Sequence, residues 1–212
     1  MTPTYPCVSV VTTVYDRVAC LDRCLRAMRH VRNTNFEQIV VSDCPAPEVQ
    51  DQIRNVVASA DPRMRVQHYN LPERHNDWGM TPAWVGVKQA LGEYVCFLSD
   101  DNAYLPDHFP PLVALLDQHP GLGFVYSSCL YDGRCELRTA PPMGARIDLG
   151  QPLFRRQVLL DCFPRGFPWH EFAWDWRLIH ALMERGVTWK HHDALSFVFR
   201  LASYPALMES LA

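Results

Sequence analysis

The sequence lacks a basic excess, a long apolar run and any C-x-x-C pair of cysteines. Its 20 lysine and arginine residues are outnumbered by 23 aspartate and glutamate residues, which gives a formal net charge of −3. A general nucleic-acid-binding protein usually carries surplus positive charge, so we expect no nucleic-acid partner. Only Lys88 and Lys190 are lysines, and this skew toward arginine fits either anion binding or genomic base composition.

The absence of long apolar runs argues against a membrane span, which needs about 18 or more consecutive apolar residues. The first 17 residues also lack the basic leader and apolar stretch of a signal peptide. The eight cysteines include no C-x-x-C pair, and Cys7, Cys96 and Cys129 lie in apolar, strand-like runs. These features predict buried free thiols in a cytoplasmic protein, with peripheral contact with a membrane left open.

In the first half of the chain, short apolar runs alternate with helical patterns. Residues 7–13 are typical of a buried strand, and residues 38–42, 65–69 and 94–98 indicate three further strands. Between them, apolar spacings of three and four predict helices that start at about residues 18, 48 and 84. This alternating order predicts an α/β fold of three layers, with a mostly parallel central sheet and helices on both faces.

The second half is less regular. Its pattern predicts two helices and two strands around a loop rich in proline and glycine. The helices cover residues 105–118 and 171–185, the strands 122–131 and 187–189 (the latter at a sheet edge), and the loop 139–150. No shift in composition divides the chain, so we expect a single domain over residues 1–212.

Two carboxylates follow the apolar strand predicted at residues 94–98, with Ser99 between them and the strand. Asp100 and Asp101 are costly at the exit of a buried strand unless positive charge lies beside them. Mg²⁺ or Mn²⁺ bridged to phosphate oxygens would satisfy both, and would neutralise charge that develops on a diphosphate leaving group. An acidic turn, or an N-cap for the helix that starts near Pro106, explains the same residues without a ligand.

Three segments carry a resemblance to a known family. They are the strand and loop at residues 8–17, the run Val40-Val41-Ser42-Asp43, and the stretch from Gly79 through residues 90–102. Their order and spacing resemble the family 2 glycosyltransferases, and the third segment resembles the approach to the metal-binding DxD motif. The resemblance implies the Rossmann-like GT-A fold. It also implies a donor-binding half over about residues 1–102 and an acceptor-binding half over about 103–202.

The same resemblance implies roles for residues after the first two strands. It places Thr13, Tyr15 and Asp16 around the nucleoside of a nucleotide-sugar donor, where Tyr15 would stack on the base. Arg17 would meet a phosphate, or would be a solvated charge in the first helical turn. Asp43 would accept an N–H of a uracil-like base, or would cap a turn. UDP is the default nucleotide because it is common in this family.

Two departures from the family pattern concern the diphosphate. Ser99 stands where the first Asp of DxD is usual. The resemblance therefore places the main metal contact on Asp101, with Asp100 nearby. The Arg-Asn pair often found upstream is replaced by Ala83-Trp84-Val85, so a donor contact is missing or supplied elsewhere, with Arg74 as the candidate.

A second carboxylate pair lies in the tryptophan-rich stretch at residues 169–176. Glu171 and Asp175 are four residues apart and share one helical face. Apolar surroundings raise the pKa of a carboxylate, whereas an early helix position lowers it, so the pattern does not fix the net shift. The resemblance implies a catalytic base on this helix, with Asp175 the closest match and Glu171 second. Helix capping with aromatic packing is the structural alternative.

The remaining candidates lie in the second half. Some GT-A enzymes complete the metal shell with a downstream histidine, so the resemblance implies this role for His191 or His192. A structural role is as reasonable in a chain with nine histidines. Arg155 and Arg156 would hold the diphosphate or the acceptor, or would begin a solvated helix. Because the chain is short for this family, a homodimer or a partner subunit would complete the acceptor site.

These features together predict a metal-dependent glycosyltransferase. It would move a sugar from a nucleotide-sugar donor to a hydroxyl of a carbohydrate, a lipid-linked glycan or another acceptor, and the resemblance implies inversion. A nucleotidyltransferase shares a similar sheet, but its usual glycine-rich loop has no counterpart in residues 12–17. A non-catalytic binding or scaffold member of the fold is the other alternative, since it would tolerate Ser99 and the lost Arg-Asn pair.

Overall fold

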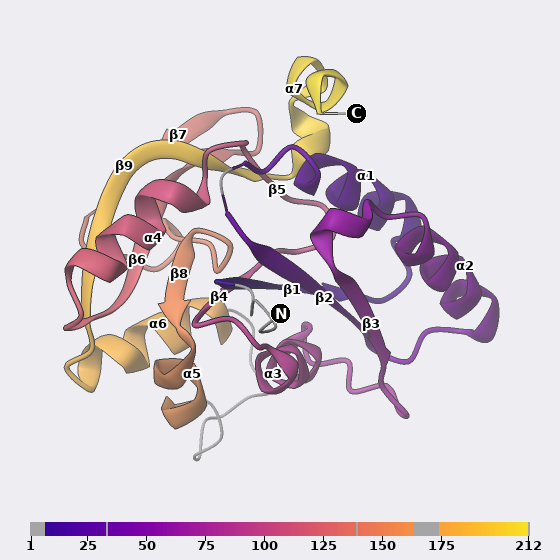
Figure 1. The fold of residues 1–212 in the computed structure, drawn as a ribbon, viewed down its shortest axis with the longest axis horizontal. Coiled ribbons are helices and arrows are strands. Elements are labelled where there is room, and N and C mark those ends of the chain that lie inside the picture. The colour runs from indigo at the N-terminus through magenta and orange to yellow at the C-terminus, as the bar shows by residue number, and fades with distance from the viewer. Residues whose placement is uncertain (1–6, 33, 139, 163–173, 212) are drawn as a thin grey trace, which may run out of the picture.

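The computed structural model describes residues 7–32, 34–138, 140–162 and 174–211. The strands of these segments form one sheet in the order β3-β2-β1-β4-β8-β6-β9-β5, and β7 pairs with β6 off this path. The sheet is curved and has helices on both sides (Figure 1). Within the described segments, every helix is too short or too polar to cross a bilayer.

The first four strands in this order run parallel, as predicted. β1 (Val8–Val14) pairs with β2 (Phe36–Ser42) on one side and β4 (Tyr94–Phe97) on the other, and β3 (Val66–Asn70) pairs with β2. β1, β2 and β4 are almost continuously buried, as expected of strands covered on both faces. Because the strands are parallel, their carboxyl ends meet at one edge of the sheet. The polar residues that follow β1, β2 and β4 therefore gather there.

The helices confirm the three-layer prediction. α1, α2 and α4 contribute to one apolar core, and α3, α5 and α6 contribute to a second core. α3 begins at Met80, four residues before the predicted start. The bounds are α1 (Val18–Met28), α2 (Pro47–Ala58), η1 (Pro62–Met64), α3 (Met80–Gln89), α4 (Phe109–Gln118), α5 (Arg156–Cys162), α6 (Trp174–Glu184), η2 (Leu201–Ser203) and α7 (Pro205–Ser210).

The second half makes the sheet mixed rather than purely parallel. β8 runs antiparallel to both β4 and β6, β7 runs antiparallel to β6, and β5 runs antiparallel to β9, whereas β6 and β9 are parallel. The sheet as a whole is therefore mixed. The bounds are β5 (Ala103–Tyr104), β6 (Leu122–Tyr131), β7 (Cys135–Leu137), β8 (Pro152–Arg155) and β9 (Thr188–Phe199).

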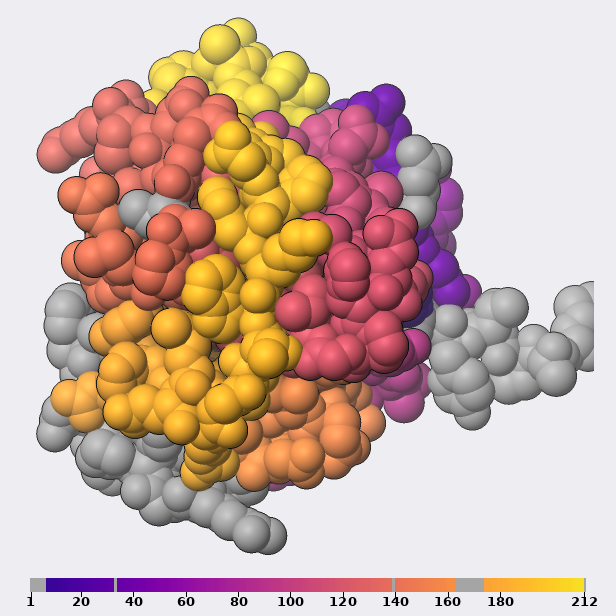
Figure 2. All heavy atoms as spheres, turned by 90° about the vertical axis from the view of Figure 1, so that its left-hand side faces the viewer, coloured from indigo at the N-terminus to yellow at the C-terminus, as the bar shows by residue number. Residues whose placement is uncertain are grey.

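The last strand differs most from its prediction. The predicted edge strand at residues 187–189 continues to Phe199 as β9 and lies between β6 and β5. The polar run His191-His192-Asp193 is the reason that the sequence pattern did not predict this continuation. The β6–β9 pairing has register shifts around Ser127 and Ser128, opposite this run. Figure 2 shows β9 at the surface, with α4 on one side and the segment around β7 on the other.

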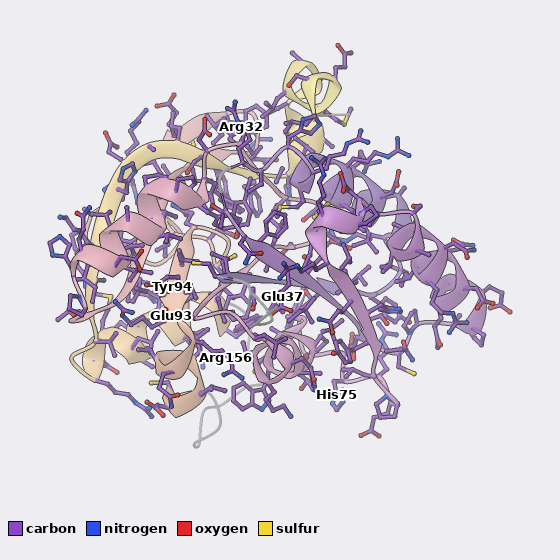
Figure 3. All side chains as sticks on the ribbon, in the orientation of Figure 1. Arg32, Glu37, His75, Glu93, Tyr94 and Arg156 are labelled. Atoms are coloured by element: carbon purple, nitrogen blue, oxygen red, sulfur yellow. The ribbon has the colours of Figure 1, made fainter. Side chains whose placement is uncertain are left out.

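A buried carboxylate fixes the turn that leads into β4. Glu37 on β2 is buried close to α3 (Figure 3). Its Oε1 accepts the Ser9 hydroxyl at 2.6 Å and the Leu91 N–H at 2.7 Å, and Ser9 Oγ accepts the Gly92 N–H at 2.9 Å. A Cβ on Gly92 would lie 2.8 Å from Ser9 N, so a side chain here would force the turn away from β1. This network anchors the start of β4, the strand that delivers the acidic pair at its other end.

Candidate functional site

A pocket of about 270 Å³ lies at the carboxyl ends of β1, β2 and β4. We call it the strand-end pocket. Five of the six residues predicted to bind the donor line it, whereas the sixth, Asp16, is exposed and lies outside the lining. The lining residues are Thr13, Val14, Tyr15, Arg17, Asp43, Arg74, Asn76, Trp78, Gly79, Pro82, Ser99 and Asp100.

Asp43 ties the loop after β3 to the end of β2. Its Oδ1 accepts the His75 N–H and its Oδ2 accepts the Asn76 N–H, both at 2.9 Å. This bonding corresponds to the turn-holding alternative. A carboxylate oxygen has two lone pairs, so each oxygen keeps acceptor capacity toward the pocket. Recognition of a base by Asp43 therefore stays a prediction.

Tyr15 and Arg74 form one wall of the strand-end pocket. The Arg74 guanidinium lies 3.9 Å from the centroid of the Tyr15 ring, and its Nη2 donates to Asn76 Oδ1 at 3.2 Å. The sequence suggested Arg74 as a replacement for the lost Arg-Asn pair, and the structure puts this arginine in the pocket. A cation packed on an aromatic face stays available to an anion on its other side.

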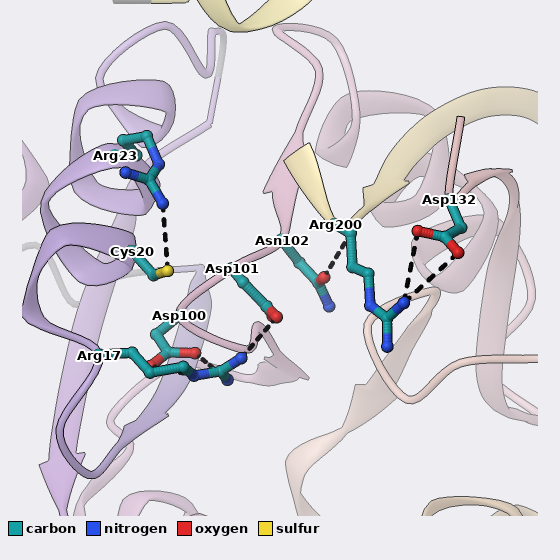
Figure 4. Close-up of polar contacts among 8 residues, drawn as sticks. All are labelled: Arg17, Cys20, Arg23, Asp100, Asp101, Asn102, Asp132 and Arg200. Atoms are coloured by element: carbon teal, nitrogen blue, oxygen red, sulfur yellow. Dashed lines mark hydrogen bonds and ion pairs between the residues drawn. The ribbon is translucent and has the colours of Figure 1, made fainter. Parts of the chain in front are cut away.

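Arg17 forms ion pairs with both carboxylates of the acidic pair, Asp100 and Asp101. Its Nε donates to Asp100 Oδ2 at 3.2 Å, its Nη2 donates to Asp100 Oδ1, and its Nη1 donates to Asp101 Oδ2 at 2.6 Å (Figure 4). The Asp100 side chain is 1% exposed, and this burial raises the pKa of its carboxyl to about 7, against the opposing effect of Arg17. The Asp101 side chain is 25% exposed and opens toward solvent.

The acidic pair suits a hard divalent cation, because carboxylate oxygens are the ligands that Mg²⁺ and Mn²⁺ prefer. In the part of the chain that the structure describes, no group of three or more His, Cys, Asp or Glu side chains is arranged to hold a metal. Two protein carboxylates, with phosphate oxygens and water, would form the shell that Mg²⁺ typically takes in nucleotide sites.

The two candidate histidines lie on β9, away from both lining sets. His191 Nε2 lies 3.0 Å from Ser128 Oγ, and its ring stacks on Tyr126 with centroids 4.7 Å apart. His192 Nδ1 accepts the Ala194 N–H at 3.3 Å. Neither histidine lines the strand-end pocket or the cavity that contains Asp175. A metal-binding role for either histidine therefore stays a prediction.

Arg155 also has a structural role. Its guanidinium donates to the carbonyl oxygens of Leu116 at 2.6 Å and Leu122 at 2.9 Å, and to Glu93 Oε1 at 3.1 Å. Arg156 begins α5, which corresponds to the helix-start alternative. Neither arginine lines the strand-end pocket or the larger cavity.

A larger cavity of about 530 Å³, which we call the main cavity, adjoins the strand-end pocket. The two share Thr13, Trp78 and Ser99 in their linings. The remaining lining residues come mainly from β6, β9, α6 and the loop before β8. They are Val11, Ala83, Phe97, Leu98, Tyr131, Leu137, Ala145, Ile147, Asp148, Leu149, Gly150, Trp174, Asp175, Trp176, Phe199 and Arg200.

Asp175 lines the main cavity from the first turn of α6. Its Oδ1 accepts the Trp176 N–H at 2.7 Å. Burial raises the pKa of Asp175 above the ordinary value, and backbone hydrogen bonds oppose this rise. The two effects weighed from the sequence are therefore both present, and burial is the larger. Glu171, the second candidate base, lies outside the described residues.

Asp148 is a cavity residue that the sequence did not indicate. Its Oδ1 accepts the Gly150 N–H at 2.8 Å, and its own N–H donates to Gln151 Oε1 at 2.8 Å. Burial raises the pKa of Asp148 to about 7, and the charge of Asp175 adds to the rise. The Asp-x-Gly pattern does signal a turn, but only the fold brings this aspartate into the same cavity as Asp175.

Solved structures with the same architecture share low sequence identity with this chain. The mannosyltransferase PcManGT from Pyrobaculum calidifontis, in complex with GDP-Man and Mn²⁺, aligns with a TM-score of 0.74 at 18% identity. The alignment covers 94% of this chain and 58% of that protein. S. aureus TarS residues 1–349, in complex with UDP-GlcNAc, aligns with a TM-score of 0.69 at 18% identity, over 91% of this chain and 58% of that one. These likenesses show the GT-A fold.

Curated relatives match over part of their length. A putative colanic acid biosynthesis glycosyl transferase, WcaA, from Escherichia coli is 22% identical over 84% of this chain and 61% of its own length. An uncharacterized glycosyltransferase from Haemophilus influenzae is 23% identical over 61% of this chain, and the match covers 40% of that protein. The chain thus spans less than two thirds of these relatives. The sequence model described as glycosyl transferase family 2 matches residues 9–174, and the chain belongs to this family.

Proposed function

We propose that the protein is a glycosyltransferase that uses a nucleotide-sugar donor. One observation carries this proposal: the strand-end pocket, with Asp100, opens beside the main cavity, with Asp175, and they share Thr13, Trp78 and Ser99. A donor whose diphosphate lay near Asp100 would present its sugar at this junction. An acceptor in the main cavity would then lie on the side of Asp175. Membership of glycosyl transferase family 2 supports the same reaction class.

The strand-end pocket would bind the nucleoside diphosphate. Tyr15 and Asp43 would contact the base, and Arg17 and Arg74 would contact the phosphates, since arginine binds phosphate through paired N–H donors. UDP is our default nucleotide, and the TarS structure with UDP-GlcNAc is consistent with it. Asp100 and Asp101 would hold Mg²⁺ or Mn²⁺, which would neutralise charge on the leaving diphosphate. The PcManGT structure with GDP-Man and Mn²⁺ is consistent with this cofactor.

Asp175 would be the catalytic base. It would take the proton of the acceptor hydroxyl as the acceptor oxygen bonds to the anomeric carbon and the bond from that carbon to the diphosphate oxygen breaks. The products would be an inverted glycoside, a nucleoside diphosphate and protonated Asp175. Burial raises the pKa of Asp175, which makes its carboxylate a stronger base. The acceptor would be a hydroxyl of a carbohydrate, a lipid-linked glycan or another molecule. The reaction would take place in the cytoplasm, and a homodimer or a partner subunit would complete the acceptor site.

Donor binding with and without Mn²⁺ tests this function. We expect isothermal titration calorimetry to show UDP-sugar binding by the wild type that depends on Mn²⁺. Asp101→Ala should abolish the Mn²⁺-dependent part, because it removes the more accessible carboxylate of the pair. Asp161→Ala, at an exposed position of α5, is the matched control and should bind as the wild type does. Metal-dependent binding that survives in Asp101→Ala would overturn the assignment.

The products separate the two alternatives. Slow release of UDP from a UDP-sugar is expected from a glycosyltransferase. Release of pyrophosphate from a nucleoside triphosphate would identify a nucleotidyltransferase instead. Donor binding with neither product, across a panel of acceptors, would favour a non-catalytic binding member of the fold.

A further inference from the structure

Trp78 stands at the junction of the two hollows. It lines both the strand-end pocket and the main cavity. It is also 69% exposed, the most exposed of the large hydrophobic side chains in the described part of the chain. A large apolar surface left in water is unfavourable, so its presence at the mouth of a pocket indicates a binding surface.

The backbone around Trp78 is held in a disfavoured conformation. The backbone φ angle is positive at Trp78 (60°), at Asn76 two residues before it (51°) and at Gly79 directly after it (83°). A bulky residue rarely adopts this left-handed region, and such residues persist where the surroundings impose them, often at ligand sites. The strain and the exposure both concern the same residue.

The surroundings impose this conformation through three side chains. Trp174 Nε1 donates to the Trp78 carbonyl oxygen at 3.1 Å. Asp77 Oδ2 accepts the Thr81 N–H at 3.0 Å and its hydroxyl at 2.5 Å, while Asp43 holds the two N–H groups just before this turn. The Trp78 carbonyl is thus bound to α6, and the residues just before it are bound to α3 and to the residue after β2, while the ring lines the junction. This arrangement presents the indole at low entropic cost.

The position of the junction indicates which part of the substrate meets the indole. The nucleoside diphosphate would occupy the strand-end pocket and the attacking hydroxyl would approach from the side of Asp175. The transferred sugar must therefore lie between them, next to the shared residues Thr13, Trp78 and Ser99. The apolar C–H face of a hexopyranose ring packs well on an indole face, whereas a phosphate does not.

We propose that Trp78 is a specificity-determining residue that packs on the hexopyranose ring of the donor and adds affinity for the sugar without touching the nucleoside diphosphate. This inference rests on the function proposed above. It separates two affinities that a nucleotide contact would change together: the affinity for the nucleoside diphosphate alone and the affinity for the complete nucleotide sugar.

Isothermal titration calorimetry with Mn²⁺ tests the inference. The probes are UDP and GDP, compared with UDP-glucose, UDP-galactose, UDP-GlcNAc and GDP-mannose. For Trp78→Ala we expect the Kd of the preferred nucleotide sugar to rise about tenfold, while the Kd of its nucleoside diphosphate stays within about twofold. Trp78→Tyr should keep most of the sugar affinity, because it keeps an aromatic face. Leu91→Ala removes an exposed apolar side chain outside both hollows and should change neither Kd.

Each other outcome is decisive. Equal losses for the nucleoside diphosphate and the nucleotide sugar would show that Trp78 serves the nucleotide or the loop, and would overturn the inference. If both Kd values stayed unchanged in Trp78→Ala and only the KM for the acceptor rose, the indole would contact the acceptor instead. This result would also overturn the inference. In both cases the glycosyltransferase function would stand. A wild type that binds none of the nucleotide sugars would overturn the proposed function and this inference together.

Discussion

The carboxylates of the strand-end pocket and those of the main cavity are held in different ways. In the strand-end pocket, Asp43 accepts a backbone N–H on each oxygen, and Asp100 is bound by Arg17, which also binds Asp101 outside the lining. In the main cavity, Asp148 and Asp175 are each held by a hydrogen bond to Oδ1 from a residue one or two positions further on. The strand-end carboxylates are therefore bound by residues far away in the sequence, whereas the cavity carboxylates are bound by their sequence neighbours.

This difference suits the two groups of carboxylates to different functions, ligand binding and proton transfer. Carboxylates matched by fixed N–H groups and a guanidinium are organised to bind, because their charge is already compensated. Burial raises the pKa of Asp100 as well as those of Asp148 and Asp175. Arg17 opposes the rise at Asp100, and backbone hydrogen bonds oppose it at the two cavity carboxylates. A carboxylate held by neutral N–H groups is better suited to proton transfer than one bound by a fixed positive charge, because it holds a proton more strongly. The three predictions below would break or sharpen the comparison.

The largest effect is expected from Asp175→Asn. An amide cannot take the proton of the acceptor hydroxyl, so kcat for transfer should fall by roughly 10²–10⁴-fold. The Kd for the nucleotide sugar, measured by calorimetry, should stay within about twofold, because Asp175 lines only the main cavity. Asp161→Asn, at an exposed position of α5, is the matched control. Normal transfer by Asp175→Asn would show that the cavity carboxylate is not the base.

An intermediate effect is expected from Arg17→Gln. Arg17 and a divalent cation compete for the same carboxylate oxygens, so without a nucleotide the variant should bind Mn²⁺ about tenfold more tightly than the wild type. Electron paramagnetic resonance of free Mn²⁺ measures this affinity. Arg26→Gln removes a surface ion pair with Asp22 on α1 and should leave it unchanged. Equal Mn²⁺ affinity in Arg17→Gln and the wild type would mean that Arg17 does not compete with the cation for Asp100 and Asp101.

The smallest effect is expected from Asp148→Asn and concerns stability. Folding raises the pKa of Asp148 from its ordinary value to about 7. Its contribution to stability is therefore fully present below about pH 4 and is lost as pH rises through 7. Asparagine does not titrate, so the variant should gain on the order of 1–2 kcal/mol of unfolding free energy relative to the wild type between pH 5 and pH 8.

Urea denaturation at pH 5 and pH 8 measures this difference, and Asp161→Asn again serves as the control. An identical pH dependence in Asp148→Asn and the wild type would mean that the Asp148 carboxyl is well solvated. The proton-transfer character inferred for the main cavity would then lose the support of a raised Asp148 pKa.

The parallel half of the fold and much of the strand-end pocket could be predicted from the sequence. The runs that became β1, β2 and β4 are largely apolar and local, and parallel strands place the residues that follow them at one edge of the sheet. The family resemblance gave Thr13, Tyr15 and Asp43 their predicted donor-binding roles, and Asp100 was singled out by its position after an apolar strand. The mixed half was less accessible, because β8 is only four residues long and β9 carries polar residues in mid-strand.

The sequence by itself determined which segments become strands and helices in the first half, and that an acidic pair follows β4. These features depend on side-chain periodicity over a few residues. Only the tertiary structure decided that Arg17 meets Asp100 across 83 positions in the chain, that Asp148 shares a cavity with Asp175, and that Trp78 stands between two hollows. Such meetings depend on how whole elements pack and in which register they pair, and no local pattern of residues encodes that.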